Sequence, residues 1–185
     1  MNETFGEYRL IKKLAVGGMA EVFLAQKSGI EGFSKHVAIK RILEHLSDQP
    51  DFTTMFLDEG RLVAQLNHPN IVQVFDLGVI DDQYFMAMEF VDGYSLSSIM
   101  KACEDAGQGF QQSLAVYLIA QTCLGLDYAH KFRAPDGQLL NLIHRDISPQ
   151  NLMLSYEGAL KIVDFGIAKA ASNLYRTNSL TMRGK

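Results

Sequence analysis

The stretch NLIHRDISPQNLMLSYEGALKIVDFG, residues 141–166, combines a polar cluster with two short apolar runs. His144, Asp146 and Asn151 lie in the cluster, and Asp164 follows the second apolar run. Short apolar runs bounded by turn signals are typical of buried strands. Two acids, an amide and a histidine between such strands indicate either a loop that presents catalytic groups or an ordinary surface turn.

The composition excludes several classes of function. The chain has 185 residues, 48% of them hydrophobic, which is enough to bury a core in one or two domains. A net charge of -4, from 21 acidic and 17 basic residues, is too small and too mixed for a nucleic-acid or membrane surface. No secretory signal begins the chain, and its most apolar window, residues 114–126, is too short to span a bilayer. We expect a cytoplasmic segment that binds neither nucleic acid nor membrane.

Periodicity divides the chain into a strand-rich part and a helical part. Five segments are typical of strands: 7–14, 21–26, 36–42, 71–78 and 84–91. One helix is expected within residues 51–69, with Asp51 as a candidate cap and Glu59 on its apolar face. Helices are also expected at 95–107 and 112–132, and the second has a candidate buried stripe: Leu114, Tyr117, Leu118, Gln121, Leu124 and Tyr128. The predicted fold class is α+β, with a small antiparallel β lobe followed by a mainly helical one.

Two features of the strand-rich part suggest a phosphate site. A glycine-rich turn, LAVGGMAEVF at residues 14–23, can bring backbone N–H groups close to phosphate oxygens, although a plain hairpin turn fits it too. In HVAIK, the strand period places Ala38 and Lys40 on one face. Lys40 is then either exposed to solvent or paired with Glu59, because burying either charge alone is costly.

The polar cluster has the groups for phosphoryl transfer. The carboxylate of Asp146 can orient a hydroxyl and accept its proton. The amide oxygen of Asn151 and the carboxylate of Asp164 are hard ligands of the kind that magnesium prefers, together with substrate phosphates.

These motifs together resemble the protein-kinase signature set. HRDISPQN followed by DFG, with VAIK, Glu59 and a glycine-rich loop upstream in the same order, is most similar to the bacterial eukaryotic-like (Hanks-type) serine/threonine kinases. LNHPNIV and MEFVDGYSL extend the resemblance to nearly the whole chain. It implies a bilobal fold, with residues 1–91 as the N-terminal lobe and residues 92–185 as the first part of the C-terminal lobe, ending in the activation segment.

The resemblance implies ATP and Mg2+ as cofactors and assigns a role to each residue. Lys40 would hold the α- and β-phosphates and Glu59 would fix Lys40, while Asp146 would be the catalytic base, and Asn151 and Asp164 the magnesium ligands. Further nucleotide-binding positions are implied at Leu14, Ala15, Gly17, Gly18, Ala20, Val22, Ala38, Met88, Glu89, Val91 and Met153.

Regulation by phosphorylation is also implied. In this family, an arginine at the place of Arg145 can pair with a phosphate in the loop after the DFG motif. The candidate acceptors for autophosphorylation are Thr177, Ser179 and Thr181.

The chain departs from the family pattern at three positions. Ala15 and Ala20 replace two of the three loop glycines, and Ser148 stands where the catalytic loop usually has lysine. The implied activity is ATP-dependent phosphorylation of serine and threonine in protein substrates, expected of the parent protein more than of these residues alone. The alternatives are a pseudokinase that acts as a nucleotide-binding or scaffold module, and a kinase of small molecules.

Overall fold

The computed structural model describes residues 3–165, which belong to two compact units. The first unit comprises residues up to 64 together with 73–90, and the second comprises 65–72 together with the chain from 91 onward. An antiparallel sheet dominates the first unit and helices dominate the second, so the predicted α+β class is confirmed.

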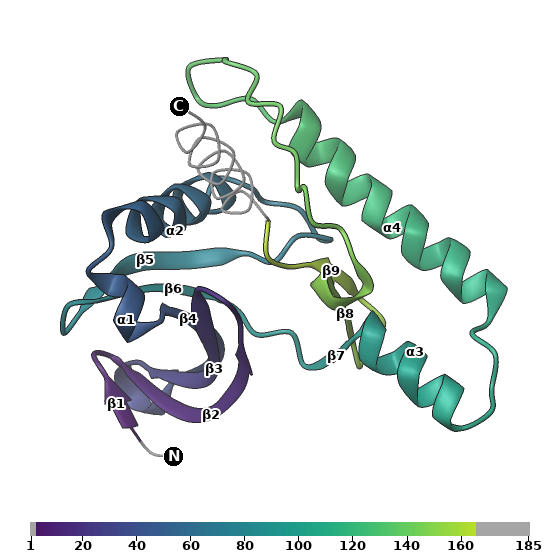
Figure 1. The fold of residues 1–185 in the computed structure, drawn as a ribbon, viewed down its shortest axis with the longest axis horizontal. Coiled ribbons are helices and arrows are strands. Elements are labelled where there is room, and N and C mark those ends of the chain that lie inside the picture. The colour runs from purple at the N-terminus through teal and green to yellow at the C-terminus, as the bar shows by residue number, and fades with distance from the viewer. Residues whose placement is uncertain (1–2, 166–185) are drawn as a thin grey trace, which may run out of the picture. The chain divides into compact units, whose positions relative to one another are not determined.

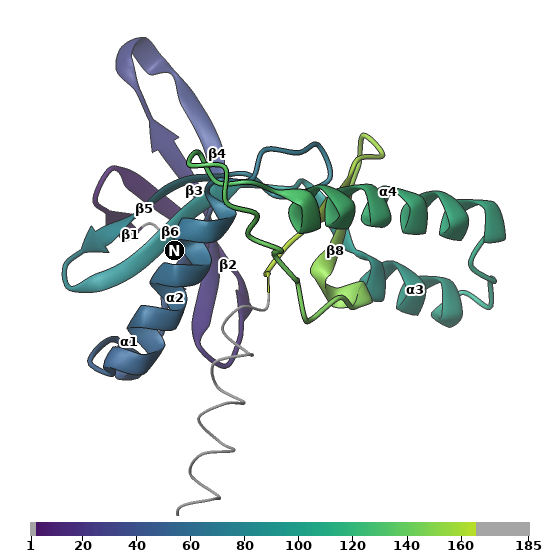
Figure 2. The ribbon, with the colours of Figure 1, turned by 90° about the horizontal axis from the view of Figure 1, so that it is seen from above.

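The first unit is built on a curled six-stranded antiparallel sheet (Figure 1). Its strand order is β1-β2-β3-β4-β6-β5. The strands are β1 (Glu3–Phe5), β2 (Tyr8–Val16), β3 (Ala20–Ser28), β4 (Ser34–Ile42), β5 (Val74–Ile80) and β6 (Gln83–Glu89). The β3–β4 hairpin projects from the sheet, with the short 3-10 helix η1 (Ile30–Gly32) at its tip (Figure 2). All five predicted strand segments are therefore confirmed, with ends shifted by a few residues.

Strand alternation produces the core of the first unit. Val37 and Ile39 of β4 are 2% and 0% exposed, as the strand period predicted. Phe85 of β6 belongs to this core. Its ring makes T-shaped contacts with the rings of Phe5 and Tyr8, at centroid distances of 5.5 and 5.6 Å. The core cluster consists of Phe5, Tyr8, Leu10, Phe23, Ala25, Val37, Ile39, Phe85 and Ala87.

Helix α2 (Pro50–Val63) follows the short α1 (Glu44–Ser47) and lies along β5 (Figure 1). Its apolar face includes Glu59, as predicted. The expected cap at Asp51 is wrong: Gln49 occupies the N-cap and makes no side-chain capping hydrogen bond, and Pro50 begins the helix because its fixed φ suits the first turn. A β-carbon at Gly60 would lie 2.7 Å from Leu77 and 2.9 Å from Met86, so the glycine allows the helix to approach the sheet.

The second unit contains two helices and a small sheet. Helix α3 (Leu96–Asp105) is capped by Ser95, whose hydroxyl accepts a hydrogen bond from the Ser98 amide, and α4 (Gln112–Lys131) follows it. The sheet has the order β7-β8-β9 and is antiparallel throughout. Its strands are β7 (Gly93–Ser95), β8 (Leu152–Ser155) and β9 (Leu160–Ile162), and the 3-10 helix η2 (Pro149–Asn151) precedes β8.

Helix α4 buries a different stripe from the one that hydropathy predicted. Leu118 is 2% exposed as expected, but Tyr117 and Leu124 are 46% and 55% exposed in the described structure. The buried side chains are Leu118, Thr122, Gly125 and Ala129. A β-carbon on Gly125 would lie 2.8 Å from Ile162, so small residues let β9 approach the helix. The prediction failed because these small residues give almost no hydropathy signal.

Residues 65–72 are joined to the second unit by the buried side chain of Asn70. Its Nδ2 donates to the Leu160 carbonyl at 3.1 Å and to Gln121 Oε1 at 3.2 Å, and its own carbonyl accepts from the Ile162 amide at 2.8 Å. The Tyr128 hydroxyl accepts from the Asn67 amide at 3.2 Å. The segment therefore adds a strand-like edge beside β9, where Ile71 pairs with Ile162.

Among the helices of residues 3–165, none combines the length and apolar character needed to cross a membrane.

Gly93 of β7 lies directly against the backbone of β8. A β-carbon there would lie 2.0 Å from the Leu154 carbonyl oxygen, which as backbone cannot move aside. We predict that Gly93→Ala lowers the free energy of unfolding by about 1–3 kcal/mol, measured by urea titration. Gly109→Ala is the matched control, because its β-carbon would meet nothing within 4 Å. Equal stability of the two variants would contradict the close β7–β8 contact.

Candidate active site

The first unit contains a buried ion pair between β4 and α2. Lys40 Nζ lies 2.9 Å from Glu59 Oε1, and the two side chains are only 13% and 9% exposed. Each charge would be costly to bury alone. Of the two alternatives that the sequence left for Lys40, the structure therefore shows the pair with Glu59. The lysine is partnered and not simply exposed to solvent.

The register of the sheet gathers four predicted nucleotide-binding residues on one face. Ala38 and Lys40 are two residues apart in β4, and because successive side chains of a strand point to opposite faces, these two share a face. Val22 of β3 is directly opposite Lys40, and Met88 of β6 is directly opposite Ala38. Because directly paired residues point to the same side of a sheet, all four side chains line the face opposite the core.

The glycine-rich turn lies between β2 and β3 and is held at both ends. The Gly17 amide donates to the Ala20 carbonyl at 2.8 Å, and the Leu43 amide beyond β4 donates to the Met19 carbonyl at 3.0 Å. A β-carbon on Gly18 would meet nothing within 4 Å, and one on Gly17 would meet only the Ala20 oxygen at 3.5 Å. Packing within the described chain therefore does not require these glycines, which leaves room for a ligand to approach the backbone.

The polar loop of the second unit is organised around His144, which is 1% exposed. Its Nδ1 accepts a hydrogen bond from the Asp146 amide at 3.3 Å. A nitrogen that accepts carries no proton, so Nε2 is the protonated one and donates to the Val163 carbonyl at 3.0 Å. The ring of Phe165 packs against the imidazole at a centroid distance of 4.7 Å. A single neutral imidazole thus connects the loop to the segment after β9.

Asn151 fixes the carboxylate of Asp146. Its Nδ2 donates to Asp146 Oδ2 at 3.0 Å and to the Asp146 carbonyl at 2.8 Å. The backbone of Asn151 accepts from the Val163 amide at 3.0 Å, so the segment before Asp164 is held to the loop a second time.

Backbone strain marks both sides of this network. Arg145 and Asp164 adopt left-handed conformations with φ of 62° and 53°. Such a conformation costs a residue other than glycine roughly 1–2 kcal/mol, and it persists only where the surroundings enforce it. Here the hydrogen bonds of His144 and Asn151 hold Asp146 and Val163, the chain neighbours of the two strained residues.

The oxygen atoms of the loop fit magnesium. In the described residues no group of three or more His, Cys, Asp or Glu side chains could hold a metal ion. Magnesium needs less, because one or two carboxylates suffice when phosphate oxygens and water complete its shell. With its nitrogen turned to Asp146, Asn151 directs its amide oxygen elsewhere, and Asp164 adds an exposed carboxylate. This hard-oxygen set suits a magnesium ion that arrives with a nucleotide.

Other predicted site residues are distributed over both units. Leu14, Ala15 and Ala20 flank the glycine turn, and Glu89 ends β6, where its amide donates to the Gln73 carbonyl at 2.8 Å. In the second unit, Val91 begins the segment before β7, and Met153 lies in β8 opposite Ser95 and Lys161. Their ligand-binding roles remain predictions. Gly166, Thr177, Ser179 and Thr181 lie outside the described residues.

Sequence reasoning missed two structural partners of the site. The Val163 carbonyl holds His144, and the buried Phe165 covers it. A backbone carbonyl leaves no signal in a sequence, so the bond from His144 to the Val163 carbonyl could not have been predicted. The second could have been suspected, because an aromatic residue next to Asp164 needs a place to pack.

The pH dependence of stability tests the buried imidazole. Burial lowers the pKa of His144 below the ordinary value of 6.5, and the bond to Val163 opposes this only in part. The stabilisation is therefore complete above pH 6.5 and is lost as the pH falls from there through the lower folded-state pKa. We predict that His144→Gln, which keeps a donor and an acceptor but cannot titrate, flattens this loss. Urea unfolding at about pH 7.5 and about pH 5.5 measures it.

His68→Gln is the control for that measurement, because burial also lowers the pKa of His68, which lies outside the loop. An identical pH dependence in the wild type and His144→Gln would show that His144 is not held neutral by burial.

Comparison with known proteins identifies the family. Residues 8–183 match the family model of the protein kinase domain. The chain is 44% identical over 183 residues to the tyrosine-protein kinase MasK of Myxococcus xanthus, covering 99% of this chain and 28% of that protein. It is 31% identical over 179 residues to the serine/threonine-protein kinase PrkC of Bacillus subtilis, covering 97% of this chain and 25% of that protein.

A solved structure shows the same fold. The crystal structure of the Mycobacterium tuberculosis PknI kinase domain superimposes with a TM-score of 0.70 at 29% identity, covering 90% of this chain and 61% of that one. The chain spans only 28% and 25% of the two curated relatives named above. With the kinase-domain match extending over residues 8–183, the chain belongs to the protein kinase family and is related to the bacterial eukaryotic-like kinases.

Proposed function

We propose that the protein containing this chain transfers the γ-phosphoryl group of ATP to serine and threonine hydroxyls of proteins, with Mg2+ as cofactor. The hydrogen-bond network of His144, Asp146 and Asn151 carries the proposal, because it holds a carboxylate in one orientation within a loop that also offers magnesium ligands. A cytoplasmic location, where ATP and protein substrates are available, goes with it.

Asp146 acts as the general base in this mechanism. As the substrate hydroxyl oxygen bonds to the γ-phosphorus and the bond to the ADP oxygen breaks, the hydroxyl proton passes to the Asp146 carboxylate. Asn151 orients that carboxylate through the 3.0 Å bond to Oδ2. His144 fixes the backbone of Asp146 without taking part in the proton transfer.

Two sets of residues are proposed to match the charge of the phosphates. Lys40, held by Glu59, binds the α- and β-phosphates, and Gly17 and Gly18 allow backbone N–H groups to approach them. A magnesium ion, held by Asn151 and Asp164, neutralises phosphate charge when it is bound. Val22, Ala38 and Met88 form the proposed apolar face for the adenine, since Val22 is paired with Lys40 and Met88 with Ala38 in the sheet.

Autophosphorylation is the proposed means of regulation. Arg145 follows the buried His144 and is itself exposed, so its guanidinium is available to a phosphate. Thr177, Ser179 and Thr181 remain the proposed acceptors.

Substitution of the base tests the mechanism. We predict that Asp146→Asn lowers the turnover of phosphate transfer from radiolabelled ATP by about 10²–10⁴, because the general base is lost, while nucleotide affinity stays nearly unchanged. Asp127→Asn is the matched control, since within residues 3–165 Asp127 forms an exposed ion pair with Lys131 on α4. Full turnover in Asp146→Asn would refute the assignment. Nucleotide binding without transfer in the wild type would favour the pseudokinase.

The chemical class of the acceptor is the second test. Tyrosine is the alternative acceptor, favoured by the 44% identity to a relative named a tyrosine-protein kinase. We predict that mass spectrometry of phosphorylated protein substrates finds phosphate on serine and threonine. The absence of both phosphoserine and phosphothreonine, with phosphotyrosine present, would replace the proposed specificity with the alternative.

A further inference from the structure

Four charged residues form one ionic cluster at the end of the first unit's sheet. Glu21 is at its centre: Lys13 Nζ lies 2.6 Å from Glu21 Oε2, and Arg41 Nη2 lies 2.8 Å from Glu21 Oε1. Arg41 Nη1 also contacts Glu3 Oε1 at 3.1 Å. The cluster thus connects strands β1, β2, β3 and β4.

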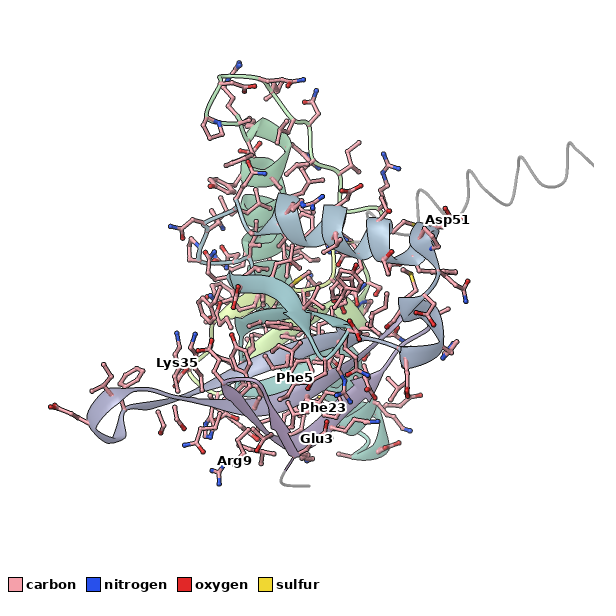
Figure 3. All side chains as sticks on the ribbon, turned by 90° about the vertical axis from the view of Figure 1, so that its left-hand side faces the viewer. Glu3, Phe5, Arg9, Phe23, Lys35 and Asp51 are labelled. Atoms are coloured by element: carbon pink, nitrogen blue, oxygen red, sulfur yellow. The ribbon has the colours of Figure 1, made fainter. Side chains whose placement is uncertain are left out.

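Aromatic rings hold the cations of the cluster in place. The Arg41 guanidinium lies over Phe23 at 4.8 Å and over Phe5 at 5.4 Å, and Lys13 Nζ lies over Phe23 at 5.2 Å. Figure 3 shows Glu3, Phe5 and Phe23 gathered at this end of the sheet. The side chains of Arg41 and Glu21 are only 12% and 13% exposed, so their attraction is screened less than that of a surface pair.

Glu21 remains ionised in this setting. Burial alone would raise the pKa of its carboxyl, but the hydrogen bonds from Lys13 and Arg41 outweigh burial and lower it. Two cations and two carboxylates leave the cluster close to neutral. It therefore lacks the excess positive charge of an anion site, and its effect must be on the strands that it joins.

Three of those strands are the two arms of the glycine turn, β2 and β3, and the strand of Lys40, β4. Glu21 directly follows Ala20 at the end of the turn, and it is paired across the ladder with Arg41, the residue after Lys40. On the other arm, the β2–β3 ladder shifts register between Lys13 and Ala15, so regular backbone pairing is interrupted just before the turn. Lys13 faces Phe23 in the ladder and reaches Glu21 diagonally, across the interruption.

We propose that Lys13, Glu21 and Arg41 form an ionic clamp that sets the spacing of the two arms of the glycine turn and so raises the affinity for the ATP phosphates. These are positioning residues, which act through the turn and do not touch the nucleotide. The inference rests on the proposed ATP binding, because only a phosphate ligand would sense the spacing of the arms.

The clamp can be opened by one substitution with a closely matched control. Lys13→Met removes the charge but keeps an unbranched side chain over Phe23. Lys27→Met is the control: Lys27 lies 2.5 Å from Glu7 Oε1 and over the ring of Tyr8, at the opposite end of the same pair of strands. Lys13→Arg should rescue, because it restores the cation. Lys13→Gln replaces Lys13→Met if the latter folds poorly, with the same expectation.

Two measurements are made on each variant. The dissociation constant for ADP with Mg2+, measured by calorimetry, is expected to rise about two- to fivefold in Lys13→Met. This is the range for an ion pair with one exposed partner, because the Lys13 side chain is 40% exposed. Lys27→Met and Lys13→Arg should match the wild type, and the KM for ATP should rise without a fall in kcat. Hydrogen exchange of the Gly17 amide without nucleotide should be faster in Lys13→Met than in Lys27→Met, because this amide closes the turn.

The possible results distinguish a failure of the proposed clamp from a failure of the proposed kinase function. Equal nucleotide affinity and equal Gly17 exchange in Lys13→Met and Lys27→Met would overturn the clamp and leave the proposed kinase function intact. Faster Gly17 exchange with unchanged affinity would also overturn it, since the spacing would then not matter to the ligand. A wild type that binds no nucleotide would overturn both proposals.

Discussion

The arrangement of the polar loop depends on one buried, neutral imidazole. His144 accepts from the Asp146 amide with one nitrogen and donates to the Val163 carbonyl with the other. Such a pattern requires exactly one ring proton, and burial ensures it by disfavouring the charged form. The strained backbones of Arg145 and Asp164 lie on either side of these bonds. His144 joins Asp146 directly to Val163, and Asn151 makes a second connection, through its bonds to Asp146 and to the Val163 amide.

The first unit also contains polar side chains with little exposure that are satisfied by partners, but there the partners form ion pairs. Lys40 and Glu59 are buried together, on the face of the sheet opposite the core. Arg41, the next residue along β4, turns to the other face and is paired with Glu21. One strand thus holds two cations whose partners come from different elements, the helix α2 and the strand β3. The strand thus separates the charge proposed to bind phosphate, on Lys40, from the charge proposed to position the glycine turn, on Arg41.

Sequence reasoning succeeded where the physics is local. The strand period placed Lys40 and Ala38 on one face of β4, and helical spacing placed Glu59 on an apolar face. A Lys40–Glu59 pair was therefore one of two alternatives, the other being a solvent-exposed Lys40, and the structure shows the pair. It failed where packing depends on small residues or on register. Besides Leu118, the buried stripe of α4 consists of Thr122, Gly125 and Ala129, whose small side chains contribute little to a hydropathy pattern. The Glu21–Arg41 pair could not be predicted from the sequence, because it depends on the register between β3 and β4. The Val163 carbonyl has no side-chain signature at all.

If Asn151 and Asp164 hold a magnesium ion that arrives with the nucleotide, nucleotide binding must depend on the metal. The affinity for ADP should be measured by calorimetry with Mg2+ and again with a chelator, in the wild type and in Asp164→Ala. We expect Mg2+ to strengthen ADP binding in the wild type and this gain to vanish in Asp164→Ala, because its carboxylate is the proposed metal ligand. An equal gain in both proteins, or none in the wild type, would contradict the account.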